Sequence, residues 1–286
     1  MAEIFFGPAG NSEQFYSMGY KHTVQAMKYL NEIGLNAYEY QCGRGVNVGE
    51  KTSGELKKQA EEYKIKLSLH APYYISLASP EELKRENSIK YILQSAKAAK
   101  NMGAERIVVH PGGLSGRSRN EALDLAKETL EKALTVLDEN DLSDIIICPE
   151  TMGKINQLGD LDEIIELCSM DKRLIPCIDF GHLNARTHGY YKTKDNIKEI
   201  FERIDKKLEE NKLKNFHSHF SKIEYSKGGE VRHLTFEDDV FGPDYKIVLD
   251  VVHKFGFTPR IICESAGTQS EDALIMKKYF ESIRGE

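Results

Sequence analysis

The sequence predicts a closed parallel (β/α)8 barrel that carries a metal site at the carboxyl ends of its strands. Three observations support this prediction. Short apolar segments alternate with helical patterns along the chain, and its 286 residues suit one barrel of this type, which typically has about 250 residues. In addition, a His, Asp or Glu residue follows each predicted strand from the third onward. Parallel barrels build their active sites at this end of the strands.

Eight short apolar segments are predicted to be the strands of this barrel. Their ranges are 3–6, 36–41, 65–70, 106–110, 144–149, 174–179, 214–218 and 260–264. Helical patterns separate them, so consecutive strands should run parallel within a single domain that covers residues 1–286. A doubly wound open sheet is the alternative, but an open sheet gathers its site between a few strands. Here the last six predicted strands all contribute polar residues, which favours the closed barrel.

The segments between the strands carry helix signals. In 121–137, apolar residues recur at helical spacing along one face. Ser79 and Ser118 are predicted N-caps, and each is followed three residues later by Glu. Three glycines are predicted to end helices just before a strand, namely Gly34, Gly103 and Gly256. The connection 219–243 is too long for a plain turn, and its charged and Gly residues indicate a functional loop.

The composition is that of an ordinary globular protein, with 40% hydrophobic and 29% charged residues. No apolar run approaches the roughly 18 residues of a membrane span, and the N-terminus lacks a signal-peptide pattern. We therefore expect a cytoplasmic monomer without membrane contact. The net charge of −6 argues mildly against a nucleic-acid-binding surface and suits a site that holds cations. Cysteines within the predicted strands are expected to act as small hydrophobes rather than ligands.

Six residues at the predicted strand ends are candidate metal ligands. They are His70, His110, Glu150, Asp179, His217 and Glu264, and successive members lie 29 to 47 residues apart. A single histidine at a strand end is more often structural. Six residues of metal-ligand type at successive strand ends reverse that expectation. Imidazole and carboxylate groups suit Zn2+, Mn2+ or Fe2+ better than Ca2+ or Mg2+. The set exceeds the needs of one ion, so Glu150 is predicted to bridge two ions about 3.5–4 Å apart.

Further residues near the same end are candidates for the site. His217 and His219 should point to one side of their strand, because side chains alternate along a strand. His219 is therefore a candidate ligand as well. Tyr73, at a loop of the barrel mouth, could stack on a nucleobase, although loop aromatics more often serve packing.

Taken together, these residues resemble the endonuclease IV family of apurinic/apyrimidinic DNA-repair enzymes, within the xylose-isomerase-like TIM barrel superfamily. The motifs that carry the resemblance are His70-Ala-Pro-Tyr73, His110-Pro-Gly112, Pro149-Glu150-Thr151, Asp179-Phe-Gly-His182, His217, Arg232-His233 and Glu264. The resemblance implies a (β/α)8 barrel with up to three zinc ions that cleaves DNA 5′ to an abasic site. It also implies that Tyr73 inserts at the lesion, and that Arg232 and the retained Lys222 contact the substrate.

The resemblance assigns the ligands to three ions. The first ion would be held by His70, His110 and Glu150. The second would be held by Glu150, Asp179, His217 and Glu264. The third would be held by His182 and His233. The family completes this third set with an Asp-Arg-His triplet, but the triplet here reads Val231-Arg232-His233. Valine cannot bind a metal, so Glu230 or His219 is the possible substitute.

Two enzyme functions are compatible with these residues. The first is metal-assisted hydrolysis of a DNA phosphodiester at an abasic site, with Glu150 and Glu264 as the catalytic residues. The second is the one-metal chemistry of sugar isomerases and epimerases that share this barrel. There, a set like Glu150, Asp179, His217 and Glu264 forms the one-metal site, and two Glu residues move a proton beside a metal-polarised carbonyl of a small sugar. This second hypothesis assigns no metal to four histidines, namely His70, His110, His182 and His233. It therefore ranks below the first hypothesis.

Overall fold

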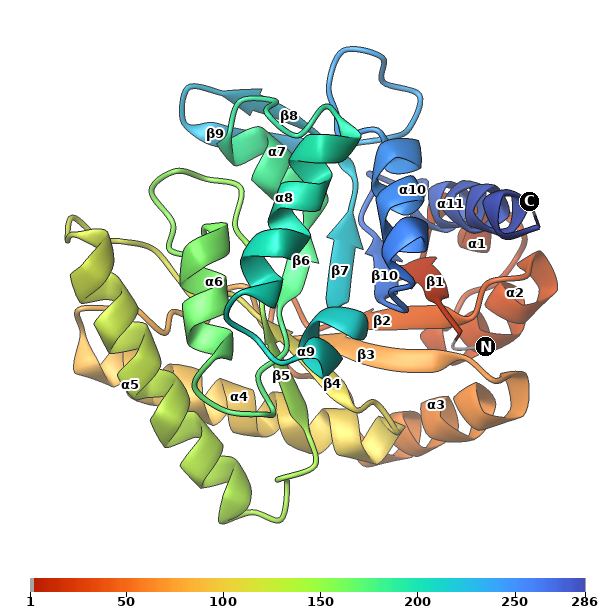
Figure 1. The fold of residues 1–286 in the computed structure, drawn as a ribbon. Coiled ribbons are helices and arrows are strands. Elements are labelled where there is room, and N and C mark those ends of the chain that lie inside the picture. Colours follow the sequence, from red (N-terminus) through yellow and green to blue (C-terminus); the bar gives the residue numbers. More distant parts are fainter. Residues whose placement is uncertain (1–2, 286) are drawn as a thin grey trace.

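The computed structural model describes residues 3–285 of the chain. Its central feature is a barrel of eight short parallel strands (Figure 1). These strands are β1 (Phe5–Pro8), β2 (Ala37–Gln41), β3 (Lys66–His70), β4 (Arg106–Val109), β5 (Ile146–Pro149), β6 (Cys177–Asp179), β7 (His217–Phe220) and β10 (Arg260–Cys263). Each lies on or close to a segment that the sequence predicts as a strand.

The strands close into a ring through two four-stranded parallel sheets. The hydrogen-bonded orders are β1-β10-β7-β6 and β2-β3-β4-β5. A parallel bridge between Ala9 and Glu39 joins the sheets at one seam, and a bridge between Glu150 and Cys177 joins them at the other. Both seams are therefore paired. This confirms the predicted closed barrel over the open-sheet alternative.

Helices surround the strands and pack their apolar faces against them (Figure 1). They are α1 (Glu13–Ser17), α2 (Ala26–Ile33), α3 (Glu50–Tyr63), α4 (Glu82–Met102), α5 (Arg119–Asp138), α6 (Leu161–Cys168), α7 (Phe180–Arg186), α8 (Lys194–Asp205), α9 (Glu210–Lys214), α10 (Tyr245–Phe255) and α11 (Gln269–Arg284), with a 3-10 turn at Thr23–Gln25. The predicted face in 121–137 is buried along α5.

Most of the predicted helix ends are confirmed. Ser118 caps α5 with Glu121 in a reciprocal capping box. Each of the three predicted glycines follows its helix in the left-handed conformation, at φ 85, 77 and 68. The prediction for Ser79 is wrong, because α4 begins only at Glu82. The Ser79 hydroxyl accepts a hydrogen bond from the Glu81 amide instead. Residues 79–81 therefore form a turn that precedes the helix.

The predicted loop 219–243 is partly ordered as strand. Strand β7 continues to Phe220, and an antiparallel hairpin follows, made of β8 (Lys222–Ser226) and β9 (Gly229–Leu234). In Figure 1 this hairpin lies at the end of the barrel toward which the β7 arrow points. A backbone bridge from Gly229 to Lys154 ties the hairpin to the segment after β5. The hairpin is therefore part of the barrel mouth.

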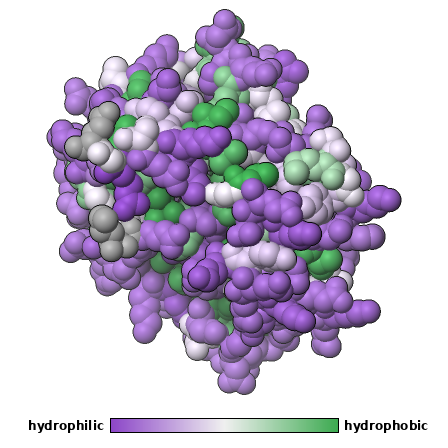
Figure 2. All heavy atoms as spheres, turned by 90° about the vertical axis from the view of Figure 1, so that its right-hand side faces the viewer, coloured by the Kyte–Doolittle hydropathy of each residue, from purple (hydrophilic) through white to green (hydrophobic). Residues whose placement is uncertain are grey.

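The face of the molecule that is on the right in Figure 1 is mostly hydrophilic. Figure 2 views the side that is on the right in Figure 1, and its apolar atoms appear only as small areas between polar side chains. No helix among residues 3–285 has the length and apolar character to cross a membrane. The five cysteines are buried and unpaired.

Candidate metal centre

The barrel mouth brings four of the six predicted strand-end residues into one pocket, namely His70, His110, Glu150 and Glu264. The pocket has a volume of about 290 Å3 and is lined by His70, Tyr73, His110, Glu150, Met152, Lys154, Gln157, His182, Glu230, His233 and Glu264. Parallel strands end side by side, so residues that are distant in sequence meet at this rim. A residue in or directly after each strand from β3 to β7, and one directly after β10, belongs to this centre.

Glu150 is the centre of the cluster, because four imidazoles approach its carboxylate. Its Oε2 lies 3.0 Å from His110 Nε2 and 3.3 Å from His70 Nε2. Its Oε1 lies 3.1 Å from His219 Nδ1 and 3.3 Å from His182 Nδ1. Burial alone would raise the pKa of Glu150, but the charges of His219 and His110 hold that pKa well below its usual range. The carboxylate is therefore ionised and available to more than one cation.

His70 is oriented by the backbone. Its Nδ1 lies 2.8 Å from the carbonyl oxygen of Ala71, so Nδ1–H donates there and Nε2 faces Glu150. Burial lowers the pKa of His70, and the hydrogen bond and charge of Glu150 outweigh it and raise that pKa to about 9. A backbone contact of this type fixes the ring of a metal-binding histidine.

A second group joins three carboxylates to one imidazole. Glu150, Asp179, His219 and Glu264 each offer a ligand atom within 4.8 Å of the others. Asp179 Oδ1 caps α7 by accepting the His182 amide at 2.7 Å. No hydrogen-bond donor among residues 3–285 satisfies its Oδ2, although His182 Nδ1 lies 3.3 Å away. Burial raises the pKa of Asp179, and the charges of Glu264 and Glu150 raise it further.

This second group has the properties of a cation site. A buried carboxylate oxygen without a donor is costly, and neighbouring carboxylates repel one another unless a positive charge lies between them. The donor set of imidazole and carboxylate matches Zn2+ and similar ions. The residues present therefore fit a divalent metal.

The structure brings His219 rather than His217 to the carboxylates. His219 Nδ1 lies 3.1 Å from Glu150 and 3.5 Å from Glu264. His217 lies deeper in the barrel, where its Nε2 is 2.9 Å from Glu39 Oε2. Burial lowers the pKa of His217 to about 4. The assignment of His217 to the second ion is corrected in this way, because β7 runs two residues further than expected and its tip presents His219.

Glu39 was not found by the sequence reasoning, although it is fully buried in β2. Its carboxylate accepts hydrogen bonds from His217, His219 and Ser68, each at 2.9 Å. Burial would raise the pKa of Glu39, but the two imidazoles hold it well below its usual range. The available signal was a glutamate in the middle of the apolar segment 36–41.

A third group contains His182, Glu230 and His233. It lies beside the imidazoles around Glu150 and the group of three carboxylates with His219. Glu230 Oε2 lies 3.5 Å from His182 Nε2, and Glu230 Oε1 lies 3.9 Å from His233 Nε2. Val231 is 50% exposed and faces away from the group. Of the two substitutes considered for the missing Asp, the structure brings Glu230 to this position and places His219 in the central cluster.

A β-bulge explains why Glu230 takes this place. Adjacent residues Glu224 and Tyr225 of β8 pair with Arg232 and Glu230 of β9, so Val231 is an extra residue in the hairpin. Side chains alternate along a strand, so a regular β9 would place residues 231 and 233 on one face. The extra residue shifts this alternation by one. Glu230 therefore shares a face with His233.

The loop after β5 also helps to place Glu230. The Glu230 amide donates to the Gly153 carbonyl oxygen at 3.1 Å. A Cβ on Gly153 would lie 2.7 Å from Glu230 Cβ and 2.9 Å from His182 Cδ2. Only glycine allows this close approach, so residue 153 is part of what brings the hairpin to His182.

The predicted substrate-binding residues have different positions. Tyr73 is 61% exposed and lines the pocket. Arg232 points outward and pairs with Glu224 at 2.6 Å, because it is adjacent to His233 and side chains alternate along a strand. Lys222 donates to the carbonyl oxygens of Phe236 and Asp238 and so anchors the following loop. Lys154 supplies the positive charge on the pocket wall, and no sequence signal identified it.

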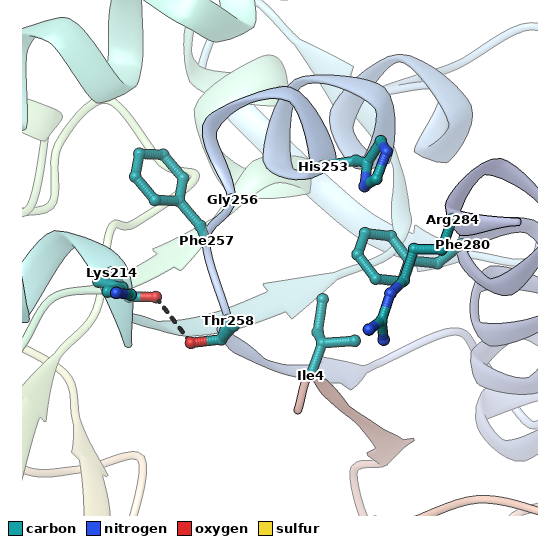
Figure 3. A pocket seen from close by; sticks show the side chains of 8 residues that line it. All are labelled: Ile4, Lys214, His253, Gly256, Phe257, Thr258, Phe280 and Arg284. Atoms are coloured by element: carbon teal, nitrogen blue, oxygen red, sulfur yellow. Dashed lines mark hydrogen bonds between the residues drawn. The ribbon is translucent and has the colours of Figure 1, made fainter. Parts of the chain in front are cut away.

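Another pocket lies at the opposite end of the strands. It has a volume of about 340 Å3 and is lined by Ile4, Lys214, His253, Gly256, Phe257, Thr258, Phe280 and Arg284 (Figure 3). Ile4 and Thr258 precede β1 and β10, so this pocket is at the amino end of the barrel. The figure shows the apolar side chains of Ile4, Phe257 and Phe280 next to polar and charged ones, and the Thr258 hydroxyl donates to the Lys214 carbonyl oxygen. The candidate ligands are at the other end.

Comparisons with known proteins agree with this architecture. The chain is 35% identical over 278 residues to an uncharacterized protein of Methanocaldococcus jannaschii, with 97% of each chain covered. It is 34% identical over 172 residues to a probable endonuclease 4 of Mycoplasma pneumoniae, which covers 58% of this chain and 57% of that protein. Its fold is similar to that of a D-tagatose 3-epimerase-like protein, with a TM-score of 0.70, 21% identity and 99% of each chain covered.

The family assignment rests on the match over most of the barrel. The sequence pattern of the Xylose isomerase-like TIM barrel family matches residues 27–284. This range includes every strand except β1 and all of the candidate ligands. The likeness to the epimerase-like structure shows the fold alone, because the identity is low. The chain belongs to the Xylose isomerase-like TIM barrel family.

Proposed function

We propose that this protein is a metal-dependent phosphodiester hydrolase that resembles endonuclease IV and cleaves DNA 5′ to abasic sites. The observation that carries the proposal is the arrangement of ligand groups around Glu150. One carboxylate contacts four imidazoles, and a third group with Glu230 lies beside it. One-metal sugar chemistry needs only the central group. The additional histidines are what a multi-ion hydrolase requires.

Zn2+ is the proposed ion, and Mn2+ or Fe2+ are possible with the same ligands. The proposed first set is His70, His110 and Glu150, the second is Glu150, Asp179, His219 and Glu264, and the third is His182, Glu230 and His233. When bound, such ions polarise phosphate oxygens and lower the pKa of water. The shared carboxylate of Glu150 would hold the first two sets together.

The proposed catalytic residues are Glu150 and Glu264. The Glu264 side chain is 16% exposed and lines the pocket, so it can accept a proton from an attacking water. Tyr73 at the rim is placed to stack on or beside an abasic nucleotide. Lys154 on the pocket wall can contact a phosphate, a role that the sequence suggested for Arg232 and Lys222.

The function is tested with a nicking assay on a DNA duplex that holds one abasic site. The zinc-loaded protein is expected to cleave the strand 5′ to the lesion and to leave the matched intact duplex uncut. Treatment with a chelator should abolish cleavage, and added Zn2+ should restore it, because the ligands form the proposed active site. An abasic duplex that remains intact at high protein concentration would contradict the proposal.

The third ligand group leads to a separate prediction about metal content. Glu230→Gln is expected to hold one zinc ion fewer per chain than the wild type, since an amide is a poor replacement for a charged ligand. Native mass spectrometry gives the count. Glu224→Gln is the matched control, because Glu224 lies on the same hairpin and pairs outward with Arg232. Equal metal content in all three proteins would contradict a ligand role for Glu230.

A one-metal sugar isomerase or epimerase is the second candidate. The observation that favours it is the central group itself, because Glu150, Asp179, His219 and Glu264 form a complete four-ligand set. In addition, the pocket of about 290 Å3 is small enough to enclose a small sugar. The test is incubation with ketohexoses and chromatographic analysis of the products. Sugar conversion together with an uncut abasic duplex would favour this candidate over the hydrolase.

A further inference from the structure

The buried carboxylate of Glu39 lies directly behind the candidate ligands, and the proposed reaction does not use it. It comes from the middle of β2, which belongs to a different four-stranded sheet from the strand β7 that it contacts. Glu39 Oε1 accepts from His219 Nε2 at 2.9 Å, and Glu39 Oε2 accepts from His217 Nε2 at 2.9 Å. One carboxylate therefore contacts both imidazoles of the His-Ser-His sequence.

This contact determines which nitrogen of His219 carries hydrogen. An ionised carboxylate only accepts hydrogen bonds, so the imidazole must donate from Nε2. A neutral imidazole that donates from Nε2 has its lone pair on Nδ1. His219 Nδ1 is the atom that faces Glu150 and Glu264, at 3.1 and 3.5 Å. In the neutral ring that metal binding requires, this contact with Glu39 leaves the lone pair of His219 Nδ1 free for a cation.

Glu39 is itself held in position by other donors. Ser68 Oγ donates to Oε2 at 2.9 Å, and Gln41 Nε2 donates to Oε1 at 3.2 Å. His217 makes its contact with Oε2 and has no second hydrogen bond among the described residues, because its Nδ1 is unpartnered. The two outer donors and His217 fix the plane of the carboxylate. This arrangement gives His217 a function distinct from metal binding.

We propose that Glu39 is a positioning residue, held by His217 and Ser68, that orients His219 with Nδ1 toward the central metal. The inference rests on the proposed function in one respect, namely that His219 binds a metal. Carboxylates that accept the second N–H of a metal-bound histidine set its tautomer and increase its basicity. Loss of such a partner typically lowers metal affinity about 10- to 100-fold.

The test is the metal affinity of Glu39→Gln, which changes the charge but keeps the size. An amide offers one acceptor and one donor group, so it cannot accept from both imidazoles. We expect the affinity of the central site to fall about 10- to 100-fold, measured by competition for Zn2+ against a chromophoric chelator. The absorption spectrum of the Co2+-loaded protein should also change, because the coordination of the ion depends on the His219 ring.

Glu163→Gln provides a matched control. Glu163 is also a buried glutamate, 6% exposed, but it binds Arg119 and the backbone amides at the start of α6. This variant is expected to lose stability without a change in metal affinity. If Glu39→Gln behaves like Glu163→Gln, with lower stability and unchanged affinity, Glu39 has a structural role only and the proposal is overturned.

The two proposals fail in different ways. If the wild type binds no divalent ion, the proposed function fails and this inference fails with it. If the wild type binds zinc and Glu39→Gln binds it equally well, only the inference fails. Should Glu39→Gln not fold, nitrogen NMR of the zinc-loaded wild type decides the question. A proton on His219 Nε2 supports the proposal, and a proton on Nδ1 overturns it.

Discussion

Glu150→Gln is expected to lower the rate of abasic-site cleavage about 1,000-fold or more, equivalent to roughly 4 kcal/mol of transition-state stabilisation. The reason is the central place of this carboxylate. Four imidazoles lie within 3.3 Å of its oxygens, and it belongs to two of the ligand groups. An amide has one oxygen and no charge, so it cannot serve two cations. Both proposed sets lose a ligand in one substitution.

The measurement is the single-turnover nicking rate of the abasic duplex, with metal content determined on the same sample. Glu128→Gln is the control, because Glu128 is an exposed residue of α5 that pairs with Lys132. The control should keep the wild-type rate and metal content. If Glu150→Gln cleaves the duplex at a rate close to that of the wild type, Glu150 is not part of the reaction centre.

His219→Gln and His217→Gln are expected to differ strongly in metal binding. His219 Nδ1 faces two carboxylates, so its loss should remove an ion from the central group and abolish cleavage. His217 contacts Glu39 instead, and a glutamine amide can donate to that carboxylate in the same place. We therefore expect His217→Gln to keep the wild-type metal content and most of the activity. The effect on zinc affinity should be at least about 10-fold larger for His219.

The two variants are compared by chelator competition and by nicking. Thermal melting of the metal-free proteins identifies any general loss of fold, which would affect both measurements. The opposite result, with His217 essential for metal and His219 dispensable, would restore the assignment that the sequence resemblance suggested. It would also contradict the positioning role of Glu39, since that role requires His219 as the ligand.

Much of the fold was predictable from the sequence because it depends on local patterns. Apolar segments of strand length alternate with helical periodicity, and the segments found as strands agree with the predicted ranges apart from their ends. Glycines in the left-handed conformation end the helices as expected. The strand-end positions of Glu150, Asp179 and Glu264 also follow from this pattern, because parallel strands bring their carboxyl ends to one rim.

Other parts of the site depend on contacts between distant residues. Glu39 forms a hydrogen bond with His219, which is 180 positions away in the chain. No local sequence pattern predicts such a contact. The choice between His217 and His219 depends on where β7 ends. That point is set by pairing with β6 and β10, in which His219 is opposite Asp179 and Ile262. A strand end predicted two residues too early changes the ligand.

The sequence by itself therefore determined the barrel, the end that holds the candidate site and the residue types of that site, because each follows from short-range periodicity and spacing. Only the tertiary structure decided which atoms meet. The bulge at Val231 is the clearest case, since one extra residue in β9 turns Glu230 toward His182 and onto the same face as His233. The alternation of a strand depends on its pairing, and pairing is a property of the folded chain.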